Sequence, residues 1–166
     1  MTTKSTPAYH FRRIRPEDNS TVAHIIRTVM TEYDCVGDGY SIHDPEVEDM
    51  AGAYAQKGSV FLVLEEEGVI IGCGGIAPLA GGDADTCELR KMYFLPEARG
   101  KGLGRKLLEL CLDEARQFGY KKCYLETVAR MNKANRLYQK AGFELLDAPL
   151  GKTGHNSCDS QYLKVL

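Results

Sequence analysis

Apolar residues recur along the chain with two periods, and these periods predict an alternation of strands and helices. Alternating or continuous apolar runs bounded by turn residues predict strands at 10–15, 59–65, 69–77, 87–95, 122–128, 143–146 and 161–166. Apolar positions three and four residues apart predict helices at 16–33, 45–56, 103–118 and 132–141. This order predicts a mixed α/β domain, with a sheet of about seven strands and helices on both of its faces. The strand–helix–strand unit from 87 to 128 is expected to be parallel.

A glycine-rich, basic turn joins the strand at 87–95 to the helix at 103–118. Gly100, Gly102 and Gly104 alternate with other residues, and Arg99 and Lys101 add positive charge. The glycines leave backbone N–H groups accessible where the helix begins, and the helix dipole adds partial positive charge there. Such a turn suits a phosphate or pyrophosphate. From the glycines alone, a tight strand-to-helix loop with solvated basic side chains fits equally well.

Two familiar phosphate-binding motifs do not fit this chain. The dinucleotide fingerprint G-x-G-x-x-G fails because Arg105 stands where a glycine is required. The P-loop fails because Leu146 stands where its first glycine belongs, although Gly-Lys-Thr follows at 151–153. The pattern that does fit is Arg-x-x-Gly-x-Gly at 99–104.

That pattern resembles the acyl-CoA pyrophosphate loop of the GCN5-related N-acetyltransferase (GNAT) superfamily. The block at 88–96 precedes it, and the block at 134–143 is similar to the family's A-x-x-L-Y-x-K-x-G-F segment. The resemblance covers nearly the whole chain and implies a single domain over 1–166 with a central, mixed, mostly antiparallel sheet. It also implies an N-acetyltransferase that moves the acetyl group of acetyl-CoA directly to a primary amine of a small molecule or peptide.

By resemblance, three segments would hold acetyl-CoA. The strand before the turn would hydrogen-bond the pantetheine arm, the turn would hold the pyrophosphate, and the helix at 132–141 would pack along the arm. The implied contacts are Met92, Tyr93, Phe94, Leu95, Arg99, Gly100, Lys101, Gly102, Leu103, Gly104, Arg105, Asn132, Asn135 and Tyr138. The family often has asparagine seven residues before its tyrosine, where this chain has Met131. Asn132 and Asn135 are therefore the candidate amides nearby.

The implied reaction needs a base and an acid. Deprotonating an ammonium group with a pKa near 10.4 costs about 4–5 kcal/mol at pH 7. Glu88 stands where some family members carry a catalytic glutamate, and it would act directly or through a water. Its alternative role is an ion pair with Arg90 or Lys91. Tyr138 matches the family tyrosine that protonates the leaving thiolate, and a packing role in the core is its alternative.

Two predicted loops, 34–45 and 147–159, border the acceptor pocket by resemblance. Tyr33, Tyr40, His43 and His155 are the substrate-binding candidates there, and ordinary loop structure is the alternative for each. The run H-x-x-C-D at 155–159 is weak support for a nucleophile or a metal ligand, and no metal is expected.

Composition limits the remaining classes of function. The chain has 166 residues, is 43% hydrophobic and 27% charged, and carries a net charge of −2, as expected of a soluble globular domain. No basic stripe predicts nucleic-acid binding, and no apolar run reaches membrane-spanning length. The six cysteines contain no C-x-x-C pair, which favours reduced thiols and a cytoplasmic location.

A second functional class stays open from the sequence. A non-catalytic acyl-CoA-binding sensor or interaction module would need the same coenzyme turn. Glu88 and Tyr138 occupy the matching catalytic positions, and this favours an enzyme. The resemblance also leaves a homodimer open.

Overall fold

The sheet of this protein contains seven strands, as the apolar pattern predicts. The computed structural model describes residues 8–166, so the tail before residue 8 lies outside the described part. The strands follow the order β1-β2-β3-β4-β5-β7-β6 across the sheet. Their bounds are Tyr9–Arg13 (β1), Val60–Glu66 (β2), Val69–Pro78 (β3), Thr86–Phe94 (β4), Lys122–Thr127 (β5), Glu144–Leu145 (β6) and Ser160–Val165 (β7). Only β4 and β5 pair in parallel, which confirms a mixed, mostly antiparallel sheet.

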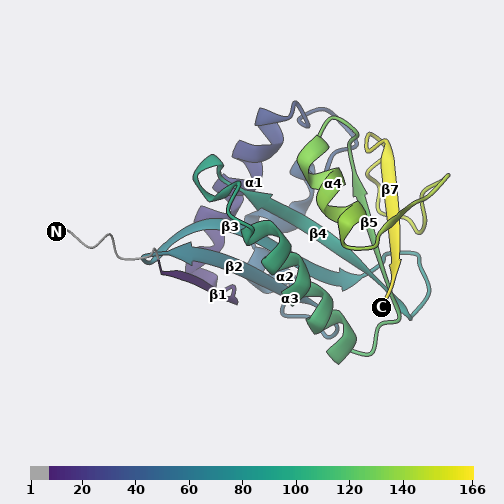
Figure 1. The fold of residues 1–166 in the computed structure, drawn as a ribbon, viewed down its shortest axis with the longest axis horizontal. Helices are drawn as coiled ribbons and strands as arrows, with labels where there is room; N and C mark the ends of the chain where they lie inside the picture. Colours follow the sequence, from purple (N-terminus) through teal and green to yellow (C-terminus); the bar gives the residue numbers. More distant parts are fainter. Residues whose placement is uncertain (1–7) are drawn as a thin grey trace.

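Helices cover both faces of the sheet, with α1 and α2 on one and α3 and α4 on the other (Figure 1). Their bounds are Asn19–Glu32 (α1), Met50–Ala53 (α2), Leu103–Gln117 (α3) and Asn132–Lys140 (α4). Short 3₁₀ turns occupy Pro16–Asp18, Ser41–His43, Pro45–Glu48 and Pro96–Ala98. No helix within residues 8–166 is both long enough and apolar enough to cross a bilayer.

The helix expected at 45–56 is instead two short pieces. A 3₁₀ turn ends at Glu48, and Asp49 then leaves helical geometry at φ −147° and ψ 68°. The Asp49 side chain accepts a hydrogen bond from the Gly52 backbone N–H at 3.0 Å and so caps a new helix of four residues. Side-chain capping thus divides a segment whose apolar spacing alone favours one helix.

An apolar cluster fills the space between the sheet and the helices on each face. On one face, α1 contributes a buried stripe that includes Val22, Ile25, Ile26 and Val29. On the other face, α3 contributes a buried stripe of Leu107, Leu108, Cys111, Leu112 and Ala115, whereas the apolar Phe118 that follows the helix is exposed. Full burial of a large aliphatic side chain stabilises a fold by roughly 1.5–3 kcal/mol, so these stripes fix both helices against the sheet.

The strands β4 and β5 separate after a short stretch of pairing. Their paired residues are Thr86 with Lys122, Cys87 with Cys123, and Glu88 with Tyr124. Beyond Glu88, β4 continues to pair with β3 as far as Phe94. The edge of β4 that faces β5 therefore has backbone groups without a strand partner over this stretch. Figure 1 shows the two strands diverging toward α1 and α4.

A β-bulge lies on β4 where the divergence begins. The register with β3 shifts between Cys73 and Gly75, and Lys91 takes a left-handed conformation with φ 51°. A positive φ is unusual for a residue with a long side chain, and bulges bend the strand that carries them. The bulge changes the direction of β4 next to the gap, and the candidate site lies at this gap.

Candidate active site

Two cavities meet at the gap between β4 and β5. They share Met92, Tyr93, Met131 and Ala134 as lining residues, so the two cavities adjoin each other. The first, which we call the turn cavity, is bordered by the glycine turn and by the start of α3. The second, the carboxylate cavity, is lined by Glu88, Glu126 and His155, among other residues.

The glycine turn has the backbone geometry that its sequence predicts. Gly100 and Gly102 have φ angles of 74° and 75°, and Gly102 directly precedes α3. A Cβ atom at either position would meet no atom within 4 Å, so the requirement for glycine comes from backbone conformation rather than packing. The N–H groups of the first turn of α3 therefore border the cavity without side-chain cover, as an anion site requires.

Basic side chains surround this turn in different ways. Arg99 binds Glu32 through two contacts of 2.7 and 2.6 Å and donates to the Phe94 carbonyl at 3.0 and 2.8 Å. Its guanidinium thus fixes the turn between β4 and α1. Arg105 and Lys133 are exposed and line the turn cavity, and the only hydrogen bond or ion pair of either side chain within residues 8–166 is the exposed pair of Arg105 with Glu109 at 3.1 Å, which an anion can replace. Positive charge and backbone donors together make this cavity suited to a pyrophosphate.

A glutamate at position 102 is expected to weaken coenzyme A binding. Gly102→Glu would place a carboxylate over the N–H groups, and losing one charge-assisted hydrogen bond alone raises Kd by roughly 10–100-fold. Gly119→Glu is the matched control, because Gly119 lies at the other end of α3 with φ 91° and equally open space. Both variants should show the same strain of roughly 1–2 kcal/mol. Calorimetry with coenzyme A should separate them, and equal Kd values would contradict a pyrophosphate site at the turn.

Glu88 is a buried carboxylate on the floor of the carboxylate cavity. It is 3% exposed, and its Oε1 accepts a hydrogen bond from Arg90 Nε at 2.6 Å. Burial raises the pKa of Glu88 above its ordinary value, although Arg90 opposes this. Oε2 has no hydrogen bond within residues 8–166, where no fully buried side-chain oxygen or nitrogen lacks a partner. Oε2 therefore opens to the cavity and can accept a proton from a bound molecule.

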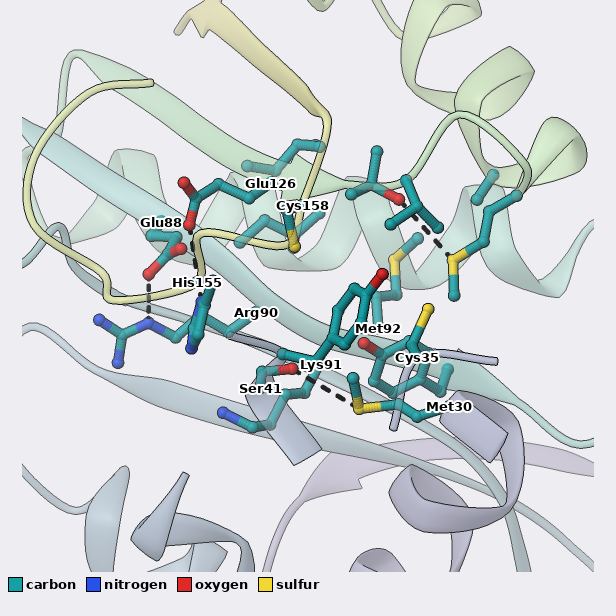
Figure 2. A pocket seen from close by; sticks show the side chains of 18 of the residues that line it. Met30, Cys35, Ser41, Glu88, Arg90, Lys91, Met92, Glu126, His155 and Cys158 are labelled. Atoms are coloured by element: carbon teal, nitrogen blue, oxygen red, sulfur yellow. Dashed lines mark hydrogen bonds and ion pairs between the residues drawn. The ribbon is translucent and has the colours of Figure 1, made fainter. Parts of the chain in front are cut away.

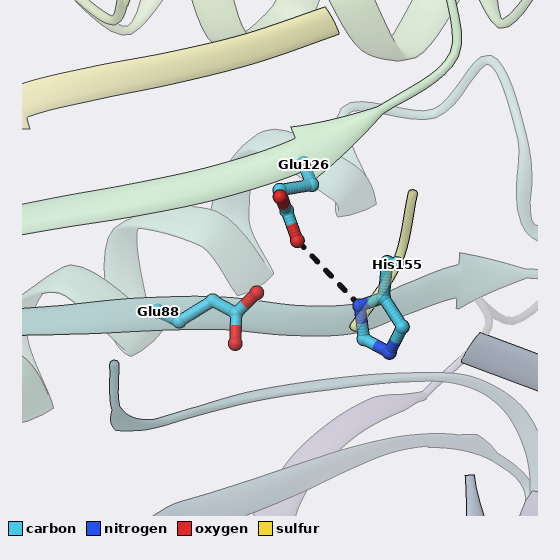
Figure 3. A group of neighbouring side chains, drawn as sticks. All are labelled: Glu88, Glu126 and His155. Carbon is cyan, nitrogen blue, oxygen red and sulfur yellow. Dashed lines mark ion pairs between the residues drawn. The ribbon is translucent and has the colours of Figure 1, made fainter. Parts of the chain in front are cut away.

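His155 lies between two carboxylates, as Figure 3 shows for one of them. Its Nε2 is 2.9 Å from Asp44, and its Nδ1 is 3.5 Å from Glu126 Oε1. Burial opposes the charged form, but the hydrogen bonds to Asp44 and Glu126 prevail and raise the pKa of His155 to about 9. The imidazole is therefore protonated at neutral pH and holds both carboxylates together rather than serving as a base.

Glu126 is held in place from several sides. Tyr124 donates to Oε2 at 2.9 Å, and Thr153 donates to Oε1. Burial alone would raise the pKa of Glu126, but the hydrogen bonds from His155, Thr153 and Tyr124 hold it below its usual value. Glu126 is thus an ionised carboxylate whose two oxygens are both engaged.

Lys91 attaches the loop before α2 to the bulge. Its side chain is 2% exposed, and its ammonium group lies 2.9 Å from Asp44 and in contact with Glu46. Glu46 also accepts a hydrogen bond from Tyr54 at 3.1 Å. Since Asp44 contacts both Lys91 and His155, one carboxylate joins the bulge of β4 to the loop that carries His155.

The side chains of Glu88, Glu126 and His155 also have the spacing of a metal site, because they offer ligand atoms within 4.8 Å of one another. Their contacts do not require a cation, however. Both nitrogens of His155 face carboxylates, and both oxygens of Glu126 accept hydrogen bonds. Protonated His155 offsets one of the two carboxylate charges, and Arg90 pairs with Glu88, so we assign no metal to the cluster.

The carboxylate cavity has a charged end and a sulfur-lined end. Figure 2 shows Glu88, Arg90, Glu126 and His155 gathered at one end, with Met30, Cys35 and Met92 at the other. Cys158 also lines the cavity, and burial raises the pKa of its thiol to about 12. At neutral pH this cysteine is a protonated thiol and therefore a poor nucleophile.

Tyr138 reaches the cavity from α4. Its ring is 6% exposed and packs against Phe143 and Tyr162, with centroid distances of 6.0 and 6.1 Å. The hydroxyl has no hydrogen bond within residues 8–166, and the absence of unpaired, fully buried polar atoms there places its oxygen at the cavity surface. Burial raises the pKa of Tyr138 well above neutrality. The phenol is thus protonated and free to donate.

Most of the expected coenzyme contacts come together at the turn cavity. Its lining includes Met92, Tyr93, Phe94, Arg99, Gly100, Gly102, Leu103, Gly104 and Arg105. Leu95, Lys101, Asn132 and Asn135 line neither cavity. Leu95 donates its backbone N–H to Ile71 at 2.9 Å, and the Lys101 ammonium group lies 5.9 Å from the centre of the Tyr9 ring. Their neighbours, rather than these residues, face the gap.

The position of Asn135 is at odds with a coenzyme contact. Its amide donates to the carbonyls of Val128 and Met131 at 3.0 and 2.8 Å and accepts from Tyr162 at 2.8 Å. These bonds join the start of α4 to β5 and β7, so the side chain has a structural role. Asn132, the first residue of α4, is exposed.

The acceptor-side candidates separate into three groups. Tyr40 and His155 line the carboxylate cavity, as expected. Tyr33 lines the turn cavity instead. His43 is exposed, lines neither cavity, and places its Nε2 2.7 Å from the Val36 carbonyl.

Several residues of the site are absent from the predicted set. Glu126 carries a readable signal, because it is a lone acid in the apolar strand at 122–128. Asp44 carries none, since it lies in a loop and meets His155 across 111 positions of sequence. Lys133 and Leu137 line the turn cavity from α4, at positions that a helical face through Tyr138 could have indicated.

Comparisons with known proteins agree with this geometry. Residues 23–143 match the model of the acetyltransferase (GNAT) family. The chain is 46% identical over 156 residues to the uncharacterised N-acetyltransferase YjgM of Escherichia coli (strain K12), and the match covers 93% of each chain. A GNAT-family acetyltransferase structure from Staphylococcus aureus Mu50 superposes with a TM-score of 0.82 at 18% identity, covering 95% of this chain and 99% of that one. The PaiA N-acetyltransferase of Thermoplasma acidophilum, solved with coenzyme A, gives a TM-score of 0.74 at 18% identity, covering 96% and 99%.

Proposed function

Because the chain belongs to the GNAT family of acetyltransferases, we propose that it transfers the acetyl group of acetyl-CoA directly to a primary amine of a small molecule or peptide. The observation that carries this proposal is the junction of the two cavities. A basic, glycine-lined cavity adjoins one that holds a buried carboxylate, Glu88, and a free phenol, Tyr138. A thioester at this junction would have a candidate base and a candidate acid beside it.

The turn and the unpaired edge of β4 are the parts suited to acetyl-CoA. The N–H groups after Gly102, with Arg105 and Lys133, would hold the pyrophosphate. The backbone from Met92 to Phe94, which has no strand partner on the side facing β5, would hydrogen-bond the pantetheine arm as an added strand does. When bound, acetyl-CoA supplies an activated acyl group.

Glu88 and Tyr138 would handle the protons of the transfer. Glu88 takes a proton from the bound ammonium group, and the freed amine attacks the thioester carbonyl carbon. The new C–N bond forms as the C–S bond breaks, and Tyr138 donates its proton to the departing sulfur. After the attack the nitrogen is positively charged, and it releases its second proton to solvent. Glu88 also releases its proton to solvent and the Tyr138 phenolate takes one up, so that one proton is released overall. Both side chains line the same cavity, which supports a direct transfer without an acetylated enzyme.

The proposal is tested by measuring thiol release from acetyl-CoA with a panel of amines, and by detecting the acetylated product by mass spectrometry. Release that depends on an amine and matches the product is the expected result. Tight binding of acetyl-CoA without transfer to any amine would instead favour the non-catalytic acyl-CoA-binding module.

Three further assignments belong to this proposal. The chain would act as a single domain in the cytoplasm, since all six cysteines are free thiols and five of them are buried. Family resemblance is the basis for proposing a homodimer. Sedimentation of the purified protein measures its oligomeric state.

A further inference from the structure

The two cavities are bordered by segments of opposite charge. The turn segment at 99–106 contains four basic residues and no acidic one. The segment at 34–48, which borders the carboxylate cavity, contains five acidic residues and no lysine or arginine. Since the whole chain carries a charge of only −2, this contrast is local. The anionic coenzyme and the acceptor would thus meet fields of opposite sign.

Carboxylates outnumber cations in and around the carboxylate cavity. The acidic residues there are Asp34, Asp38, Asp44, Glu46, Glu88, Glu126 and Asp159. The cations are Arg90, Lys91, Arg130 and His155. Even with His155 protonated, the negative charges are in excess.

The cations already have partners within the protein. Arg90 donates to Glu88 and to the Pro78 carbonyl at 3.1 Å, and the ammonium group of Lys91 is enclosed by two carboxylates. Arg130, at the rim, donates to the carbonyls of Tyr33 and Asp34 at 2.6 and 3.0 Å. A carboxylate on an acceptor would therefore compete with existing contacts.

The attacking ammonium group of an acceptor, by contrast, finds an unmatched oxygen. Glu88 Oε2 opens to the cavity and has no hydrogen bond within residues 8–166. When Glu88 takes the proton of the attacking amine, one carboxylate charge and one ammonium charge are lost together, and the six remaining carboxylates still outnumber the four cations. A second cationic group on the same molecule keeps its charge throughout and can offset this excess.

We propose that the acceptor is a small primary amine that carries a second cationic group and no carboxylate, such as a diamine or polyamine. This inference rests on the proposed amine acetylation and specifies its substrate class. The acidic segment at 34–48 attracts the acceptor, and the excess of negative charge around the carboxylate cavity favours the cation that is not consumed in the reaction.

Three five-carbon amines test the inference as matched probes. Cadaverine has two amines, pentylamine has one, and lysine is cadaverine with a carboxylate added. We expect kcat/KM to be about tenfold or more higher for cadaverine than for either of the other two, a difference of about 1.4 kcal/mol per tenfold step. Lysine or pentylamine at or above the rate of cadaverine would overturn the inference and leave amine acetylation standing. No transfer to any amine of the wider panel would overturn the proposed function itself.

A pair of double variants separates the local charge from the net charge. Asp34→Asn with Asp38→Asn removes two of the five acidic charges of the segment at exposed positions, and asparagine tolerates the φ of 56° at position 34. Glu67→Gln with Asp113→Asn removes the same charge from exposed sites outside both cavities. The first pair should lower kcat/KM for cadaverine by roughly 3–10-fold and weaken its dependence on salt, without changing the KM for acetyl-CoA. Equal values for the two double variants would contradict the inference.

Discussion

Tyr138→Phe is expected to lower kcat by roughly 10²-fold or more, which is the usual contribution of a positioned proton donor. The change keeps the ring that packs against Phe143 and Tyr162 and removes only a hydroxyl that has no partner within residues 8–166. We therefore expect the melting temperature and the Kd for coenzyme A to stay close to those of the wild type. Steady-state kinetics and thermal unfolding on the same preparation measure both.

Tyr162→Phe is the matched control for this prediction. The Tyr162 hydroxyl donates to Asn135 at 2.8 Å and accepts from Gln139 at 3.3 Å, so its loss leaves the Asn135 amide oxygen without a donor. This variant should lower the free energy of unfolding by about 1–3 kcal/mol and leave the acid step intact. If the Tyr138 variant instead turned over at the wild-type rate between about pH 6 and 9, water would be the proton donor and Tyr138 a packing residue.

Glu88→Gln is expected to lower kcat by about 10²–10⁴-fold near neutral pH. Only the ionised carboxylate can accept a proton, so wild-type activity should be lost as the pH falls through the pKa of Glu88, which burial raises above the ordinary value. At high pH the amine is increasingly neutral on its own, and the deficit of the variant should shrink. A pH profile of kcat/KM for both proteins measures these effects.

Arg90→Gln distinguishes a base from a mere ion-pair partner. Arg90 lowers the pKa of Glu88, so its removal should raise that pKa and move the acidic limb of the wild-type profile to higher pH. If Glu88 served only to pair with Arg90, the two variants would lose stability alike and share an unshifted pH profile.

Element order and the glycine turn were readable from the sequence because their signals are local. The stripe from Leu107 to Ala115 defines α3 by its period, and Gly100 and Gly102 mark a backbone that needs positive φ. The prediction of one continuous helix at 45–56 was wrong, because the side chain of Asp49 accepts a hydrogen bond from a backbone N–H that a continuous helix would use.

The charged half of the site depends on contacts that no local pattern contains. Lys91 in a strand reads as a surface residue, and its burial follows from a bulge and from Asp44 and Glu46, which lie 47 and 45 positions away in the sequence. Asn135 sits in the right block for a coenzyme contact, yet its amide is taken up by neighbouring carbonyls and by Tyr162. Which groups a buried side chain contacts depends on the complete fold, because the contacting residues lie far apart in the sequence.

The short pairing of β4 with β5 also bears on how long the protein survives in a cell. Three residue pairs join the two parts of the sheet. A coenzyme arm along the unpaired edge of β4 would add backbone hydrogen bonds that the chain itself does not make there. Binding of that kind adds to the free energy of unfolding, by about 2.7 kcal/mol when the ligand is present at 100 times its Kd. The supply of acetyl-CoA would then set not only the rate of the enzyme but also its resistance to proteolysis, so that a cell short of acetyl groups would also keep less of the enzyme.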